Sequence, residues 1–259
     1  MTVPFLSLYM FSFNMLYASC CVMAQFYVYR SRCLKQRMLT SVKSLENMIT
    51  YVCRELPELY KEYRKMVTKI KYGNTNTFII RGTDKNLLID TDYAGTISMF
   101  YRAIKESGIT VKDIDYVLAT HFHPDHIGLI SELMEQGVKL LLIKPQVRSV
   151  HYSDEIFSRT PKLGYKPIDE TKAVVISVEA SRDFLEEMGI KGEIIHTPSH
   201  SEDSISVVLD EGICIVGDLE PYEYIGGYDQ NKALESDWDK VLSYNPSIVY
   251  YAHANEKQF

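Results

Sequence analysis

The chain of 259 residues contains few cysteines, and their positions argue against the usual structural roles of cysteine. Of the five, four fall in the first 53 residues and one, Cys214, stands alone far downstream. None belongs to a C-x-x-C pair and the count is odd, so we expect neither a disulfide framework nor a structural zinc knuckle. This usage fits a protein that is kept in a reducing compartment.

The sequence also lacks a basic stripe. Its formal net charge is −6 at pH 7, and no run of lysine or arginine marks residues 66–259. Nucleic-acid phosphates are bound by such a basic footprint, so we expect no nucleic-acid partner and favour a small-molecule substrate. With 46% hydrophobic and 24% charged residues, the chain can still form a sizeable core.

No charged residue occurs from Met1 to Tyr29, and basic residues follow before any acid. A bilayer is spanned by roughly 20 apolar residues, and the basic cluster would stay on the cytoplasmic side. The pattern predicts a membrane anchor, with membrane association through residues 5–29 and a cytoplasmic catalytic region tethered to the inner face. The alternative, of equal standing, is that Met66 is the natural start and residues 1–65 are a dispensable extension.

Residues 30–65 are predicted to form a helical linker. Apolar residues between Ser41 and Val67 recur at steps of three and four, with Pro57 as an interruption. This stripe favours a helix packed on its own domain over a dimerising coiled coil. The sequence assigns no oligomeric state.

From Met66 onward, short runs of β-forming residues alternate with amphipathic helices. The predicted strands are 69–72, 77–81, 86–90, 116–119, 139–143, 193–196, 204–209, 213–216 and 248–251. The predicted helices contain the apolar stripes at 97–104, 127–134 and 234–241, and residues 144–190 are expected to form a helical insertion beside the site. Two sets of strands with interspersed helices predict a layered α/β sandwich, with helices outside two packed sheets.

The strongest chemical signal is an H-x-H-x-D-H cluster formed by His121, His123, Asp125 and His126. The cluster follows a predicted strand and precedes a predicted helix, where side chains can converge on a ligand. Imidazoles and a carboxylate suit a borderline divalent cation such as Zn²⁺. A solvent-exposed polar loop is the alternative, but four potential ligands this close together are costly unless something neutralises and orients them.

Four further motifs occur around this cluster, and the whole set resembles the metallo-β-lactamase superfamily over about residues 66–259. The motifs are Leu87-Leu88-Ile89-Asp90-Thr91, His196-Thr197-Pro198-Ser199-His200, Val216-Gly217-Asp218 and Tyr251-Ala252-His253. The resemblance implies an α/β fold, the four-layer αββα sandwich of the metallo-β-lactamase type, here with an N-terminal helical extension. It is specific for the fold and the metal site, and says little of the substrate.

The resemblance also implies two metal positions. The implied ligands are His121, His123 and His200 for the first metal, Asp125, His126 and His253 for the second, and Asp218 as a bridge between them. Two Zn²⁺ are expected, with iron or manganese as alternatives. Asp90 and His196 would orient the ligands without binding metal.

The sequence departs from the family pattern beside His200. Ser199 stands where glycine is commonest, and residues 201–204 replace the Gly-Ser that often follows the motif, which implies an altered pocket wall. Further along, Tyr222 and Tyr224 are candidate substrate contacts, although a place in the pocket wall or the core is the favoured alternative.

The resemblance implies a metal-dependent hydrolase, in which a metal-bridging hydroxide attacks a small ester, thioester, lactone or phosphoester. Asp125 is the candidate catalytic residue, which would orient the water and pass a proton to the leaving group. Asp218 stands where secreted β-lactamases place a cysteine, which disfavours antibiotic hydrolysis. Two alternatives stay open: an iron-dependent oxidoreductase of the persulfide-dioxygenase kind on the same fold, and a non-catalytic membrane-tethered binding protein.

Overall fold

The computed structural model describes residues 66–227 and 231–259. The anchor, the dispensable extension and the helical linker predicted for residues 1–65 lie outside these ranges. Within the described ranges, no helix is both long enough and apolar enough to cross a membrane.

The first sheet contains six strands and opens the described part of the chain. In spatial order they are β1 (Val67–Lys71), β2 (Asn76–Arg81), β3 (Asn86–Ile89), β4 (Tyr116–Leu118), β5 (Lys139–Ile143) and β6 (Val174–Ile176). Strands β1 to β3 pair antiparallel, whereas β3 to β6 run parallel. Nearly every residue of β3 to β5 is buried, as expected for parallel strands that are covered on both faces.

The second sheet contains five strands. In spatial order they are β11 (Lys257–Gln258), β10 (Ile248–Tyr250), β9 (Ile213–Ile215), β8 (Ile205–Leu209) and β7 (Gly192–His196). Strands β9 and β10 run parallel, and the other neighbours pair antiparallel. The rings of Phe78 in β2 and Tyr250 in β10 lie 5.3 Å apart, so the two sheets pack on each other there.

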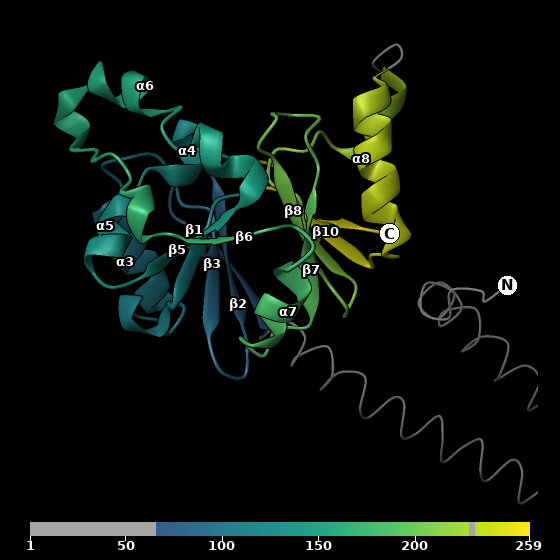
Figure 1. The fold of residues 1–259 in the computed structure, drawn as a ribbon, viewed down its shortest axis with the longest axis horizontal. Coiled ribbons are helices and arrows are strands. Elements are labelled where there is room, and N and C mark those ends of the chain that lie inside the picture. The colour runs from purple at the N-terminus through teal and green to yellow at the C-terminus, as the bar shows by residue number, and fades with distance from the viewer. Residues whose placement is uncertain (1–65, 228–230) are drawn as a thin grey trace, which may run out of the picture. The chain divides into compact units, whose positions relative to one another are not determined.

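Helices cover the outer faces of both sheets (Figure 1). The α-helices are α3 (Ile97–Glu106), α4 (Pro124–Ile127), α5 (Ile130–Glu135), α6 (Asp154–Ser158), α7 (Ser181–Glu186) and α8 (Lys232–Ser243). Phe100 of α3 and Leu133 of α5 pack with Val117 of the first sheet. Trp238 of α8 packs with Val249 of the second sheet. The layers therefore follow the predicted order of helix, sheet, sheet and helix.

Short 3₁₀ helices connect several of these elements. They are η1 (Val111–Asp113), η2 (Lys144–Ser149), η3 (Pro161–Leu163), η4 (Glu170–Lys172) and η5 (Tyr222–Gly227). The segment predicted as a helical insertion, residues 144–190, contains η2, α6, η3, η4 and α7 but also the strand β6. That expectation was therefore wrong in part, because β6 extends the first sheet parallel to β5. The three residues Val174–Ile176 are too short a run to show strand periodicity.

The helix predicted over 127–134 is divided into α4 and α5. Its break has a local cause, since two backbone N–H groups turn away from the helix toward the loop after β3. Gly128 donates to the carbonyl of Asp92 at 3.0 Å, and the N–H of Leu129 donates to Oγ1 of Thr91 at 3.2 Å. This docking fixes α4, which carries two of the predicted ligands, against the loop that follows Asp90.

Gly128 is required by this close approach. A Cβ atom built at Gly128 would lie 2.1 Å from the backbone nitrogen of Ala94 and 2.5 Å from the carbonyl oxygen of Asp92. Both contacts are with backbone atoms, which cannot rotate away. The backbone at Gly128 is right-handed helical (φ −60°), so only the lack of space forbids a side chain there.

We expect Gly128→Ala to lower the free energy of unfolding by about 3 kcal/mol, since overpacking forces the backbone apart. The matched control is Gly108→Ala, which meets no atom within 4 Å but has a φ of +72°. That control should lose only about 1–2 kcal/mol from backbone strain. Urea denaturation of both variants measures the difference, and a loss at Gly128 no larger than at Gly108 would contradict the close approach.

Candidate metal centre

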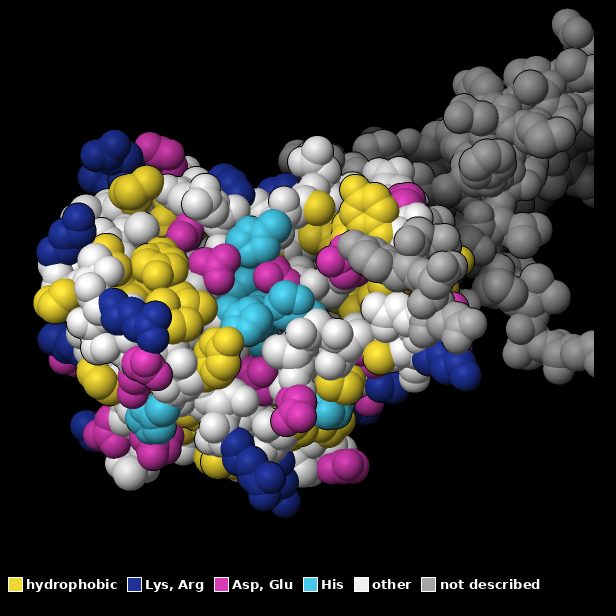
Figure 2. Space-filling model, turned by 90° about the horizontal axis from the view of Figure 1, so that it is seen from above, with side chains coloured by type: hydrophobic (Ala, Val, Ile, Leu, Met, Phe, Trp, Pro, Cys, Tyr) yellow, Lys and Arg dark blue, Asp and Glu magenta, His cyan; other side chains and the backbone are white. Residues whose placement is uncertain are grey.

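Seven potential ligand side chains come from four segments, each of which follows a strand. His121, His123, Asp125 and His126 follow β4, and the other three, His200, Asp218 and His253, follow β7, β9 and β10. In α/β sheets the carboxyl ends of the strands are the usual place for a ligand. Figure 2 shows the histidine and acidic side chains meeting on one face of the molecule.

Asp90 fixes the segment that follows β4 through contacts with Thr120 and His126. Its backbone is left-handed (φ +57°) and its side chain is fully buried. The carboxylate accepts hydrogen bonds from the backbone N–H of Thr120 at 2.6 Å and from Oγ1 of Thr120 at 2.8 Å. Its Oδ2 also lies 2.9 Å from Nδ1 of His126. Nε2 of His126 is thereby directed toward the other ligand candidates. The role of Asp90 in orienting the metal ligands stays a prediction.

The first group of ligand atoms consists of one nitrogen from each of three imidazoles, those of His121, His123 and His200. Nδ1 of His123 lies 2.9 Å from Nε2 of His121 and 3.2 Å from Nε2 of His200. One nitrogen from each of the three residues falls within 4.8 Å of the others. His121 is buried, whereas the side chain of His200 is 28% exposed, so the group opens toward solvent on one side.

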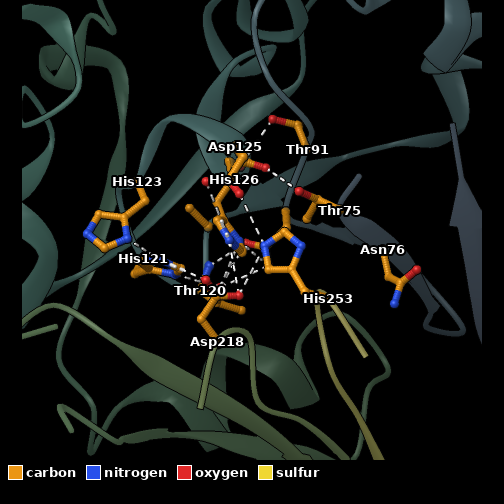
Figure 3. A network of polar contacts seen from close by, with 12 residues as sticks. Thr75, Asn76, Thr91, Thr120, His121, His123, Asp125, His126, Asp218 and His253 are labelled. Atoms are coloured by element: carbon orange, nitrogen blue, oxygen red, sulfur yellow. Dashed lines mark hydrogen bonds and ion pairs between the residues drawn. The ribbon is translucent and has the colours of Figure 1, made fainter. Parts of the chain in front are cut away.

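The second group joins Asp125, His126 and His253, whose ligand atoms also lie within 4.8 Å of one another. Nε2 of His253 is 3.1 Å from Oδ2 of Asp125. Asp218 lies between the two groups, with Oδ2 3.8 Å from Nε2 of His121 and Oδ1 3.3 Å from Nε2 of both His126 and His253 (Figure 3). The structure therefore brings together all seven predicted ligands.

The histidines of this cluster differ in their protonation near pH 7. Burial lowers the pKa of His121 and also that of His123, so both imidazoles are neutral near pH 7. Burial also opposes a charge on His126, but the carboxylates of Asp90 and Asp218 outweigh it and raise the pKa of His126 to about 10. Without metal, His126 therefore carries a proton at neutral pH.

The carboxylates of the cluster are ionised. The hydrogen bond with His253 outweighs burial and lowers the pKa of Asp125 to about 2. Burial would raise the pKa of Asp218, but His126 and the other imidazoles around it lower that pKa to about 2. The carboxylates of Asp125 and Asp218, with the neutral imidazoles of His121 and His123, form a donor set suited to a divalent cation.

Two orphaned atoms support the fit of a cation at this place. Among the described residues, Nε2 of His126 and Oδ1 of Asp218 are buried and make no hydrogen bond, although they lie 3.3 Å apart. A buried polar atom without a partner costs about 1–3 kcal/mol. A cation bound between these atoms would satisfy both. The geometry thus fits a metal centre that uses both groups of ligands.

Several residues that hold this centre were not predicted from the sequence. Asp203 accepts the backbone N–H of Phe122 at 2.8 Å, and the buried Ser153 donates to the carbonyl of Phe122 at 2.7 Å. The amide of Gln146 donates to the carbonyl of Ala119 at 2.8 Å. Polar residues of this kind carry no sequence pattern, because their partners are backbone groups distant along the chain.

Helix α8 holds the two loops that carry His200 and Asp218. The buried carboxylate of Asp237 accepts the backbone N–H of Ser199 at 2.7 Å, next to His200. The indole N–H of Trp238 donates to the carbonyl of Glu220 at 2.9 Å, two residues after Asp218. A signal for Asp237 does exist in the sequence, since an acid lies on the same helical face as the apolar residues of α8.

The start of β2 holds the remaining segments. Thr75 donates from Oγ1 to the carbonyl of Asp125 at 2.7 Å. The side-chain amide of Asn76 donates to the carbonyls of Tyr251 at 2.9 Å and Ala254 at 3.1 Å, which flank His253. One short stretch of the first sheet therefore positions ligands from both sheets.

Three further predicted residues lie outside the ligand cluster. Nε2 of His196 lies 2.8 Å from the carbonyl oxygen of Glu202, so His196 pins the loop that contains His200. The ring of Tyr222 packs on Trp238, with ring centroids 5.4 Å apart, and Tyr224 is 54% exposed. Their role as substrate contacts stays a prediction.

Comparison with known proteins shows the family of the chain and supports its fold. Residues 70–253 match the family described as the metallo-beta-lactamase superfamily. The "Probable metallo-hydrolase" MJ0888 of Methanocaldococcus jannaschii is 31% identical over 169 residues, which cover 63% of this chain and 77% of that protein. The atrochrysone carboxyl ACP thioesterase of Aspergillus fumigatus is 30% identical over 142 residues, which cover 53% of this chain and 27% of that protein.

Solved structures resemble the described domain as well. TTHA1623 in a di-iron-bound form aligns with a TM-score of 0.55 at 20% identity, covering 74% of this chain and 93% of that one. The BLEG-1 B3 metallo-beta-lactamase aligns with a TM-score of 0.51 at 18% identity, covering 74% and 94%. These likenesses confirm the predicted αββα fold. The chain covers only part of some curated relatives. It matches 59% of the length of the beta-lactamase-like protein 2 homolog of Drosophila melanogaster.

Removing the Asp237 carboxylate should loosen the loop that carries His200. We expect Asp237→Ala to lower the zinc affinity of the group formed by His121, His123 and His200 about 10- to 100-fold, as is usual for residues that orient ligands. Competition with a chromogenic chelator measures this affinity. Asp239→Ala removes an exposed acid from the same helix and should leave the affinity unchanged; equal losses in both variants would disprove the positioning role.

Metal binding should release a proton from His126. Because the pKa of His126 is raised from 6.5 to about 10, the metal-free residue is protonated across that window, and a cation requires its neutral form. Zinc affinity should therefore rise with pH between these values. The ion pair between protonated His126 and Asp90 also stabilises the metal-free protein. Its contribution to the free energy of unfolding is complete below pH 6.5 and is lost as the pH rises toward 10.

Calorimetric titration with Zn²⁺ at pH 7.5 in two buffers of different ionisation enthalpy counts the released protons. About one fewer proton should be released by His126→Ala than by the unmodified chain. A binding enthalpy that does not depend on the buffer would refute the assignment of the proton to His126.

Proposed function

Because this chain belongs to the metallo-β-lactamase superfamily, we propose that it is a hydrolase that uses two metal ions, most simply Zn²⁺, to cleave a small ester, thioester, lactone or phosphoester. One observation carries the proposal. Two groups of ligand atoms lie side by side, and the carboxylate of Asp218 faces His121 in one group and His126 and His253 in the other. Such an arrangement suits a pair of cations that share a ligand.

Each proposed metal has a defined set of side chains. The first would be bound by His121, His123 and His200, the second by Asp125, His126 and His253, with Asp218 between them. Bound there, the pair of cations would lower the pKa of a shared water toward about 7 and polarise the substrate. The protein would contribute fixed, mostly neutral imidazoles, which leave a net positive charge to stabilise a developing oxyanion.

Asp125 is the proposed catalytic residue. Its side chain is 35% exposed, so one part of the carboxylate can reach solvent and substrate while Oδ2 lies 3.1 Å from Nε2 of His253. The backbone of Asp125 is fixed by the hydrogen bond from Thr75. A carboxylate held in this way can orient the attacking water and transfer a proton to the leaving group.

The relatives bear on the substrate class. The thioesterase of Aspergillus fumigatus supports thioesters among the candidate substrates, and the di-iron form of TTHA1623 supports iron as an alternative metal. The second candidate function is therefore an iron-dependent oxidoreductase on the same fold. Elemental analysis separates the two: about two zinc per chain with ester or thioester cleavage supports the hydrolase, and iron with oxygen uptake supports the oxidoreductase.

The central position of Asp218 can be tested directly. We expect Asp218→Ala to lose bound zinc and to reduce hydrolysis of the best substrate in a panel of esters, thioesters, lactones and phosphodiesters by more than about 100-fold. Asp84→Ala removes an exposed acid in the turn between β2 and β3 and serves as the control. Undiminished turnover in Asp218→Ala would remove the proposed mechanism, and loss of turnover in both variants would point to unfolding instead.

A further inference from the structure

Tyr152 is an exposed aromatic side chain beside the metal centre. It is 58% exposed, yet its ring centroid lies 5.3 Å from that of His123, one of the proposed ligands of the first metal. A single exposed tyrosine is ordinary on a protein surface. Tyr152 differs from such a residue because its ring lies against His123, a proposed ligand of the first metal.

The backbone around Tyr152 is held firmly. The next residue, Ser153, is fully buried and donates to the carbonyl of Phe122, between the ligands His121 and His123. The preceding residue, His151, lies 2.8 Å from Asp154 through Nδ1 and 3.0 Å from Glu170 through Nε2. The ring of Tyr152 is therefore presented to solvent from a fixed loop.

The surroundings of this loop are aromatic. The ring of Phe157 in α6 stacks on Tyr165 with centroids 4.0 Å apart, and it meets Tyr93 edge-on at 4.9 Å. Figure 2 shows hydrophobic side chains gathered on one side of the histidines. The acids Asp125 and Asp218 belong to the cluster itself, so an apolar flank borders a charged centre.

We propose that Tyr152 determines substrate specificity by contacting an apolar or aromatic acyl group, while the reacting carbonyl lies at the ligand cluster. A rigid aromatic side chain offers a large contact surface and loses little conformational freedom on binding. The inference rests on the proposed hydrolase, since it names the part of the substrate that this centre would accept. The proposed contact also predicts a preference for ligands with an aromatic ring, which can be measured by binding alone, without substrate cleavage.

The test compares two carboxylates that share a metal-binding group and differ in the presence of a ring. Phenylacetate and acetate are titrated calorimetrically into the zinc-loaded full chain. The unmodified chain should bind phenylacetate more tightly, and Tyr152→Ala should reduce this preference about 3- to 10-fold, the range of one aromatic contact. Tyr152→Phe keeps the ring and should keep the preference.

Turnover is measured beside binding, with phenylacetyl and acetyl esters of the same leaving group. Tyr152→Ala should lower kcat/KM for the phenylacetyl ester and leave that for the acetyl ester within about twofold. Tyr101→Ala, which removes a 40% exposed tyrosine from α3, is the matched control. Zinc content and melting temperature should be the same in all variants.

The outcomes separate the two proposals. An unmodified chain that binds phenylacetate no better than acetate overturns the role of Tyr152, and so does a preference that survives in Tyr152→Ala. Failure of every ester to be cleaved, with the carboxylate preference present and dependent on Tyr152, would overturn the hydrolase and leave the contact intact.

Discussion

The buried carboxylate of Asp90 is the contact on which the metal centre depends. It receives two hydrogen bonds from Thr120 and faces Nδ1 of His126, and it does so from a left-handed backbone. That backbone costs about 1–2 kcal/mol in a residue other than glycine, and a buried carboxylate without partners would cost more. Charge-assisted hydrogen bonds to Asp90 offset both costs, so the strand end, the loop and His126 are fixed together.

The rest of the centre depends on polar contacts that cross between elements. Asn76, at the start of β2, holds the segment around His253, although that segment belongs to the second sheet. Asp237 of α8 holds the loop before His200. Each ligand therefore has a rigid element behind it, and the distances of about 3–4 Å between ligand atoms result from packing of the two sheets. Metal sites with this support are already arranged before the cation binds.

The sequence was sufficient to predict the layers from local patterns, and to predict which histidines and acids meet in the cluster once the motifs were compared with the family. Histidines and acids after β-forming runs predicted the cluster, and apolar periodicity predicted α3 and α8. It was insufficient where a role depends on distant backbone groups, as for Asp203 and Gln146, whose partners lie 81 and 27 residues away. It also missed β6, and it joined α4 to α5, since hydrogen bonds from the loop after β3 override a continuous helical stripe.

The same carboxylates that orient the ligands also govern the metal-free protein. Asp90 and Asp218 flank His126 on opposite nitrogens, which favours a proton on its imidazole when no cation is present. A proton and a cation then compete for one atom, Nε2 of His126. The protonated imidazole of His126 offsets part of the negative charge of Asp90 and Asp218 when no cation is bound, and this proton is exchanged for metal as pH rises. The same two carboxylates therefore set both the stability of the metal-free protein and the pH dependence of its affinity for metal.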